Sequence, residues 1–214
     1  MEKALGLRSQ VMRYVDWGFS TVTISVSSTG GDLDAALVLV DLLNELTAKG
    51  KVVARTVVVG RAASAATLVS MAGHKGHRYI LPHSKMLLHR PRVVIGAPTQ
   101  FKADELTVAS EELHRVQDGM KELYLQMSTR SEALKARYDE VLQHDDWLHH
   151  EQCLDLGLVD HIGNPPEPTS DAPEPTPDAR APEQQPGGRV VFLPSNPVQP
   201  GPPERRVWIV EKAA

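Results

Sequence analysis

The first 163 residues predict an α/β protein whose sheet is mainly parallel and whose strands are joined by crossover helices. Short runs rich in Val, Ile and Thr alternate with longer segments of helical periodicity. This order joins parallel strands through helices. The run at 52–59 is continuously apolar, which is typical of a strand buried on both faces. Glycine-led turns at Gly30-Gly31 and Gly60-Arg61 stand between strands and the helices that follow.

Each element is predicted from its periodicity and its boundary residues. The segment 7–17 has helical spacing, with its apolar residues on one side. Asp32 is suited to cap the next helix at its N-terminus, and Gly50 ends that helix. The predicted strands are 21–27, 52–59, 79–81 and 85–88, and the further helices are 33–47, 63–72, 99–128, 131–143 and 149–156.

Proline usage divides the chain into three parts. Thirteen of the sixteen prolines lie in a tail of residues 164–214, which follows an N-terminal segment of residues 1–20 and a folded domain of residues 21–163. The tail has few large apolar residues, so we expect it to be disordered. Two apolar patches interrupt it, at 190–193 and 207–210. They are either docking strands for a partner or a neighbouring subunit, or incidental.

Composition excludes several function classes. The net charge of −4 and the 5% aromatic content do not favour nucleic-acid binding. No apolar stretch approaches the ~20 residues of a membrane helix, and the first residues lack the apolar region of a secretory signal. The single cysteine, Cys153, fits a reducing compartment. We therefore expect a cytoplasmic protein with no membrane partner and no cofactor.

Ser64 and His89 are candidates for nucleophile and base. Ser64 lies at a helix start among alanines, where a hydroxyl sits near the positive end of the helix dipole. The alternative is that this serine only caps the helix. His89 ends an apolar strand just before Pro91, where it can meet a helix start from a neighbouring strand. A serine needs such a base because its free hydroxyl is a poor nucleophile.

The third catalytic member and the oxyanion hole complete the prediction. Asp145 and Asp146 are the candidates for the residue that orients the imidazole, and helix capping is their alternative role. The backbone N–H groups of the Gly30-Gly31 turn and of Ala65 are suited to hold a developing oxyanion.

A metal site is a weaker hypothesis. His144, His149, His150 and Cys153 lie close in sequence, and His149 and Cys153 share a helix face. No HExxH or paired-cysteine spacing is present, so we expect exposed helix residues and no metal.

Four segments together resemble the proteolytic subunit of the ATP-dependent Clp protease family. The first is SSTGGDLDAAL at 27–37. The block GRAASAATLVSMAGHKGHRYILPHSKMLLHRP at 60–91 contains the second and third, which are the serine segment and the histidine segment. The fourth is HDDWLHHEQCLDLGLVDHIG at 144–163, with its aspartate and its GLVD ending. The resemblance covers about residues 21–163. It implies a ClpP/crotonase-like fold and makes residues 21–163 the catalytic domain.

Carried over by position, the resemblance places the nucleophile on Ser64, the base on His89 and the aspartate on Asp145, with oxyanion donors at Gly31 and Ala65. It implies a serine endopeptidase that cleaves unfolded polypeptide in protein quality control. It further implies a homo-oligomeric ring served by an AAA+ unfoldase ATPase.

Departures from the family pattern keep alternatives open. The N-terminal segment 1–20 replaces the usual start, Thr29 stands where proline is common, and the Pro-rich tail is foreign to the family core. A phage-type relative acting as a prohead maturation peptidase, or a catalytically idle Clp-like subunit, are the alternatives. Acyl-CoA chemistry on a crotonase-like scaffold is disfavoured, because it needs no nucleophilic serine. The apolar stripe of helix 99–128 is interpreted as core, or as a contact between rings.

Overall fold

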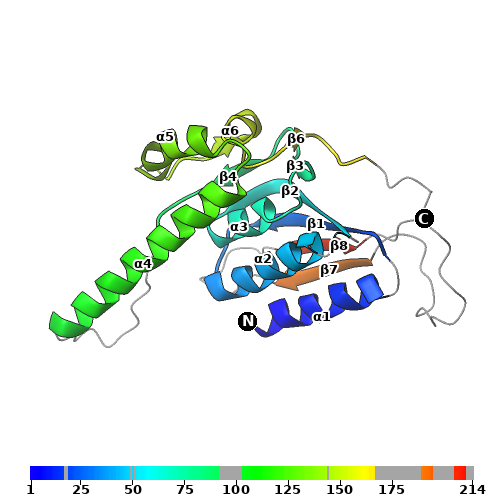
Figure 1. Cartoon of the computed structure of the whole chain (residues 1–214), viewed down its shortest axis with the longest axis horizontal. Coiled ribbons are helices and arrows are strands. Elements are labelled where there is room, and N and C mark those ends of the chain that lie inside the picture. Colours follow the sequence, from blue (N-terminus) through cyan, green and yellow to red (C-terminus); the bar gives the residue numbers. More distant parts are fainter. Residues whose placement is uncertain are drawn as a thin grey trace, which may run out of the picture.

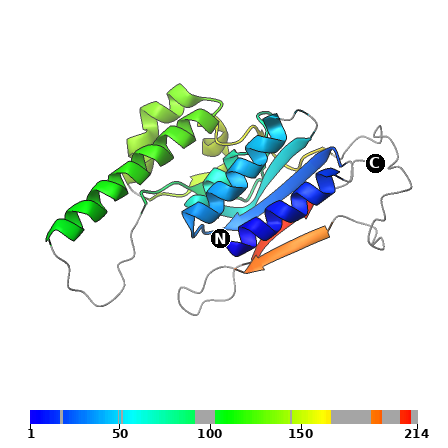
Figure 2. The same ribbon diagram turned by 60° about the horizontal axis from the view of Figure 1, so that its bottom comes forward.

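A single mixed sheet runs through the molecule, with helices packed on one of its faces (Figures 1 and 2). The computed structural model describes residues 1–16, 19–48, 50, 52–91, 103–143, 145–166, 189–194 and 205–210. The helices are α1 (Glu2–Asp16), α2 (Leu33–Ala48), α3 (Ala65–Met71), α4 (Ala103–Met127), α5 (Ser131–Gln143) and α6 (His150–Asp155). The strands are β1 (Thr21–Ser28), β2 (Val53–Ala63), β3 (Arg78–Ile80), β4 (Lys85–Leu87), β5 (Leu148–His149), β6 (His161–Ile162), β7 (Arg189–Pro194) and β8 (Arg205–Val210).

The centre of the sheet is parallel and its edges are antiparallel. The strand order is β5-β4-β2-β1-β8-β7, and β3 pairs with both β2 and β6. The pairs β1–β2, β2–β3, β2–β4 and β3–β6 are parallel, whereas β4–β5, β1–β8 and β7–β8 are antiparallel. The predicted α/β class with a mainly parallel sheet and crossover helices is confirmed.

Strand β2 differs from its prediction at Gly60. The sequence predicts that a turn at Gly60-Arg61 ends the strand, but the strand continues to Ala63. Gly60 has φ +73° and its N–H is donated to Ser84 Oγ at 2.7 Å, so the chain bends there without leaving the sheet. Before the bend β2 pairs with β3, and from Arg61 onward it pairs with β4. Ser64 therefore directly follows the part of β2 that pairs with β4.

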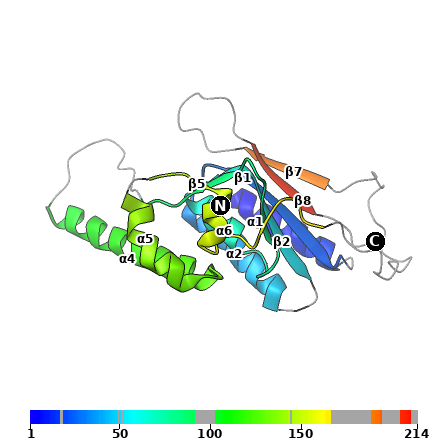
Figure 3. The same cartoon turned by 90° about the horizontal axis from the view of Figure 1, so that it is seen from above.

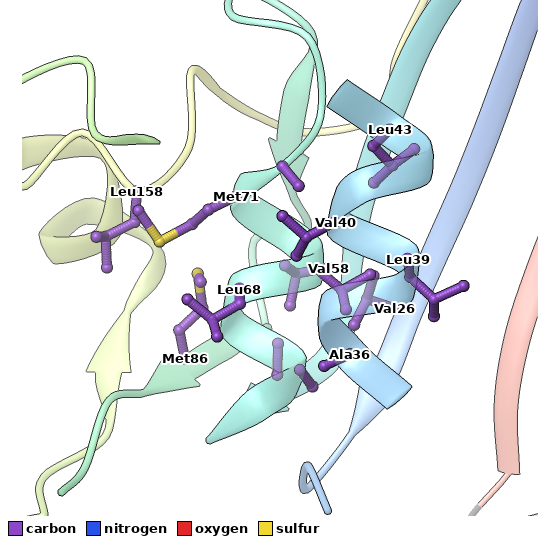
Figure 4. Packing of buried hydrophobic residues seen from close by; sticks show 14 of the residues in the cluster. Val26, Ala36, Leu39, Val40, Leu43, Val58, Leu68, Met71, Met86 and Leu158 are labelled. Carbon is purple, nitrogen blue, oxygen red and sulfur yellow. The ribbon is translucent and has the colours of Figure 1, made fainter. Parts of the chain in front are cut away.

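The main core lies between the sheet and helices α2 and α3. Val26 of β1 and Val58 of β2 point toward Val40 of α2, and Leu68 and Met71 of α3 pack beside them (Figure 4). Each of these side chains is at most 4% exposed. Full burial of an aliphatic side chain of this size contributes about 1.5–3 kcal/mol, so this contact fixes α3 and the turn in front of it.

A buried ion pair holds the C-terminal end of the domain. Arg78 of β3 is fully buried, and it donates from Nε and Nη2 to the carboxylate of Asp160, at 2.8 and 2.5 Å. Its Nη1 donates to the carbonyl of Met127 at the end of α4. Burial alone would raise the pKa of Asp160, but the hydrogen bonds and charge of Arg78 outweigh burial and lower it. The pair thus joins β3, α4 and the GLVD segment.

Helix α4 belongs to the core only in its C-terminal half. Met120 and Tyr124 are buried, whereas Leu106 and Val108 are 47% and 65% exposed. The N-terminal half projects away from the sheet (Figure 1). The interpretation of the whole stripe as core is therefore wrong for this half. The predicted residues 99–102 of the helix lie outside the described part of the chain.

Two segments of the tail form strands. β7 and β8 pair with each other, with Val190 opposite Ile209, and β8 adds to β1 with Thr23 opposite Ile209 (Figure 3). These strands coincide with the two apolar patches at 190–193 and 207–210, and the expected disorder of the tail over 164–214 stays a prediction. Both segments are rich in β-branched and aromatic residues, and the edge of β1 offers main-chain hydrogen bonds. The rest of the tail beyond residue 166 lies outside the described residues.

Candidate active site

Ser64 occupies a strained turn between β2 and α3. Its φ of 55° and ψ of −134° lie where residues with a side chain rarely occur. Such a conformation costs about 1–3 kcal/mol and persists only where neighbouring contacts impose it. The Ser64 N–H is donated to the Leu87 carbonyl at 2.9 Å, which ties the turn to β4. The Ser64 hydroxyl makes no capping hydrogen bond to α3, so the geometry does not support a capping role for this side chain.

The glycine turn after β1 lies directly against Ser64. Gly30 has φ +94°, and a Cβ placed there would lie 2.6 Å from Ser64 Cβ and 2.6 Å from the Ala63 carbonyl oxygen. Only a residue without a side chain permits this approach. The Gly30 N–H is donated to Ser28 Oγ at 3.1 Å. Gly31, the predicted oxyanion donor, follows in the same turn with φ +141°.

One cavity brings most of the predicted site residues together. It has a volume of about 500 Å³, and its lining includes Ser64, Ala65, His89 and Gly31. Helix α4 contributes one acidic residue, Glu112, and several apolar residues to the same lining, which are Ala109, Leu113, Val116 and Met120. A molecule that filled the cavity would therefore contact both the Ser64 turn and α4.

The imidazole ring of His89, two residues after β4, contacts the backbone of the next residue. Its Nδ1 lies 2.6 Å from the Arg90 carbonyl oxygen. Because a carbonyl can only accept, this contact requires the proton on Nδ1 and leaves the lone pair on Nε2. That tautomer is the one a general base needs. Among the described residues, no hydrogen bond joins Ser64 Oγ to His89.

The register of β4 and β5 bears on the choice between Asp145 and Asp146. Met86 pairs with Leu148 and Lys85 pairs with His149, in antiparallel order. Continuing that register past the strand ends puts position 145 opposite position 89. Asp145 has φ 49°, a left-handed conformation that Asp tolerates better than most residues. This extrapolated register is compatible with Asp145 as the partner of His89, and the assignment stays a prediction.

A buried hydroxyl chain supports the Ser64 turn from behind, and the sequence did not reveal it. Thr67 Oγ1 donates to the Ser64 carbonyl at 2.5 Å and lies 2.7 Å from Tyr124 Oη. With the Thr67 proton used in this way, Tyr124 donates to Thr67. Burial raises the pKa of Tyr124 to about 12, so the phenol stays protonated as the donor. Helical spacing could have predicted that Tyr124 is buried, but it could not have predicted that Tyr124 bonds to Thr67.

The residues of the metal hypothesis have structural roles. His149 is the N-cap residue of α6, and its backbone N–H is donated to Gln152 Oε1 at 2.9 Å. Cys153 is buried, burial raises the pKa of its thiol to about 12, and its Sγ donates to the Leu148 carbonyl. His144 lies outside the described residues. Within the described part of the chain, no three potential ligands gather closely enough to hold a metal ion.

Comparison with known proteins identifies the family. The family model described as Clp protease matches residues 18–166. The chain belongs to the Clp protease family. The resemblance derived from the sequence is confirmed, and family membership supports a Clp-type peptidase. No helix in the described ranges is both long and apolar enough to cross a membrane.

Two relatives show how far the likeness extends. The chain is 30% identical over 141 residues to the ATP-dependent Clp protease proteolytic subunit of Leuconostoc citreum (strain KM20), covering 66% of each protein. It is 28% identical over 141 residues to the subunit of the same name from Streptococcus pneumoniae (strain Hungary19A-6), covering 66% of this chain and 67% of the relative. The chain thus spans about two thirds of the length of these Clp relatives.

Proposed function

We propose that this protein is a serine endopeptidase that hydrolyses peptide bonds of unfolded polypeptides through Ser64, His89 and Asp145. The observation that carries the proposal is the strained Ser64 turn, which faces a cavity shared with His89 and is pressed against Gly30. A serine that only packed in a core would not require a positive φ and a glycine at van der Waals contact.

The proposed reaction follows from the positions of these groups. Ser64 Oγ attacks the scissile carbonyl carbon while its proton passes to His89 Nε2. The oxyanion that forms is held by the backbone N–H groups of Gly31 and Ala65. His89 then protonates the leaving amine, and water releases the acyl group from Ser64 by the same steps in reverse.

Asp145 is proposed to stabilise the imidazolium that forms on His89. The Arg90 carbonyl already selects the required tautomer, but it carries only a partial charge. A carboxylate stabilises imidazolium more strongly, because its hydrogen bond is charge-assisted. Full activity therefore requires His89 Nδ1 to move from the Arg90 carbonyl to the Asp145 carboxylate.

The assembly is proposed from the exposed part of α4 and from the name that the relatives share. The projecting half of α4 exposes Leu106 and Val108, and such apolar surface fits contact with other subunits of a homo-oligomeric ring. The relatives are named proteolytic subunits of an ATP-dependent protease. By this likeness, an AAA+ unfoldase ATPase would deliver substrate, and the peptidase itself would need no cofactor.

A fluorophosphonate probe tests the chemistry. Wild type should be labelled at Ser64 and should cleave an unstructured peptide, and Ser64→Ala should lose both activities. Asp145→Asn should lower kcat/KM by about 10⁴-fold, while Asp146→Asn should leave it within about threefold of wild type.

The control for these variants is the thermal unfolding midpoint, which should stay at the wild-type value. A folded, assembled wild type with no Ser64-dependent labelling would instead identify a catalytically idle subunit. A loss confined to Asp146→Asn would refute the assignment of Asp145.

A further inference from the structure

Four buried polar atoms without hydrogen-bond partners lie in strands β1 and β2 and in the loop that leads to β3. Among the described residues, they are Thr23 Oγ1, Arg55 Nε, His74 Nδ1 and His77 Nδ1. Buried polar atoms are paired in the great majority of cases, and each unpaired one costs about 1–3 kcal/mol. We call these residues the Thr23–His77 cluster. Their concentration indicates that something outside the described residues satisfies them.

The backbone places the cluster on the sheet face opposite α2 and α3. Thr23 and Arg55 are directly paired across β1 and β2, so their side chains share a face. The next residue along β2, Thr56, points the other way and donates to the Ser70 carbonyl in α3. The Thr56 N–H is donated to the His77 carbonyl, which brings His77 beside Arg55 at the start of β3.

The two histidines lie together at this site. Their ring centroids are 5.7 Å apart with an interplanar angle of 78°, and the His74 N–H is donated to the Ala54 carbonyl of β2. Arg55 is 9% exposed and Thr23 is 4% exposed, whereas both histidines are partly exposed. A ligand would therefore reach the cluster from the histidine side.

The charges at the cluster favour an anion. Burial, together with the charges of Arg55, His74 and His161, lowers the pKa of His77, and the opposing charge is that of Asp160. Asp160 is committed elsewhere, because its carboxylate accepts from the N–H groups of Gly76 and Arg78 and from the Arg78 guanidinium. It therefore does not satisfy the cluster.

The four orphaned atoms also match an anion chemically. The guanidinium Nε–H, the threonine hydroxyl and both imidazole Nδ1–H groups can all donate, and a carboxylate or phosphate oxygen only accepts. The guanidinium of Arg55 disfavours a cation at the same position. A second Arg55 nitrogen, Nη1, already donates to the Pro166 carbonyl at 2.9 Å, which fixes the direction of Nε.

We propose that Thr23, Arg55, His74 and His77 form a binding site for an oxyanion group, either a carboxylate or a phosphate. Two sources can supply it. Residues 167–183 contain five acidic residues and one basic residue, and they begin directly after Pro166. The oxyanion is therefore either a carboxylate of this acidic segment or an anion from solution. This site is separate from the Ser64 cavity and does not depend on the proposed peptidase activity.

The first experiment titrates full-length protein with inorganic phosphate and follows the imidazole NMR signals. Phosphate should shift the His74 and His77 signals saturably and should raise the pKa of His77, because a bound anion stabilises imidazolium. Affinity should accordingly be higher at pH 6 than at pH 8. Arg55→Gln should weaken binding at least tenfold, and His77→Asn should weaken it in a variant that keeps Arg55.

The matched control is Lys75→Gln, which removes an exposed cation from the same loop and should leave the affinity unchanged. The double variant Glu167→Gln, Asp171→Asn distinguishes the two sources. A higher phosphate affinity in it identifies a competing carboxylate of this chain, and an unchanged affinity identifies an anion from solution. Unshifted histidine signals in both wild type and this double variant would overturn the proposal. Equal weakening by Arg55→Gln and Lys75→Gln would also overturn it.

Discussion

Replacing Gly30 by alanine should damage the active site more than it damages the fold. The added Cβ would lie 2.6 Å from Ser64 Cβ and 2.6 Å from the Ala63 carbonyl oxygen. Because carbon atoms settle at about 3.5–4.0 Å, the Ser64 turn and the glycine turn must separate by about 1 Å. A displacement of about 1 Å at a reacting group costs about 100-fold in rate, or about 2.7 kcal/mol of transition-state stabilisation. The positive φ of Gly30 adds about 1–2 kcal/mol of backbone strain to the folded state.

The assay for Gly30→Ala pairs probe labelling at Ser64 with urea unfolding. Gly50→Ala is the matched control, because Gly50 also has a positive φ, at 63°, but a Cβ there meets nothing within 4 Å. Both variants should lose stability through backbone strain, and only Gly30→Ala should lose about 100-fold in labelling rate. Wild-type labelling by a folded Gly30→Ala protein would refute the role assigned to this contact.

Two further predictions concern the framework around the site. Tyr124→Phe should lower the free energy of unfolding by about 0.5–1.5 kcal/mol through loss of one buried hydrogen bond, measured by urea unfolding; an unchanged value would show that this hydroxyl contributes nothing. Asp160→Asn should lower it by about 3–5 kcal/mol at neutral pH, because Arg78 is left buried without its counter-charge. Since the pKa of Asp160 is lowered in the folded state, its contribution is present above the unfolded pKa of about 3.9 and is lost as pH falls through the folded value. The variant should therefore show a weaker loss of stability below pH 4 than wild type, and parallel acid-unfolding curves would contradict this account.

The sequence predicted what depends on local pattern. Helices α2 and α5 and strand β1 lie within one residue of their predicted bounds, because each is set by a long apolar period with clear ends. The turn predicted at Gly60 was wrong, since whether a glycine ends a strand or bends it depends on a partner, here Ser84. The β5 and β6 strands are two residues long, and nothing in so short a segment distinguishes it from a loop.

The sequence pointed to residues that share a cavity, although their catalytic roles stay predictions, and it did not point to the contacts that support them. Ser64, Ala65, His89 and Gly31 line one cavity, as their positions at strand and helix ends suggested. The Tyr124–Thr67 chain and the contact of Gly30 with Ser64 join residues far apart in sequence, and only the packed fold brings them together. Sequence spacing does not separate Asp145 from Asp146, and the β4–β5 register that bears on this choice exists only in the folded sheet.

The bend in β2 ties Ser64, the proposed nucleophile, to the most widely paired strand of the sheet. β2 is bonded to β1, β3 and β4, so its amides exchange with solvent only when most of the sheet opens. Because Ser64 directly follows this strand, its strained conformation cannot relax through local fraying. The geometry needed for attack should therefore persist up to the temperature of global unfolding, and heat inactivation should coincide with loss of the fold.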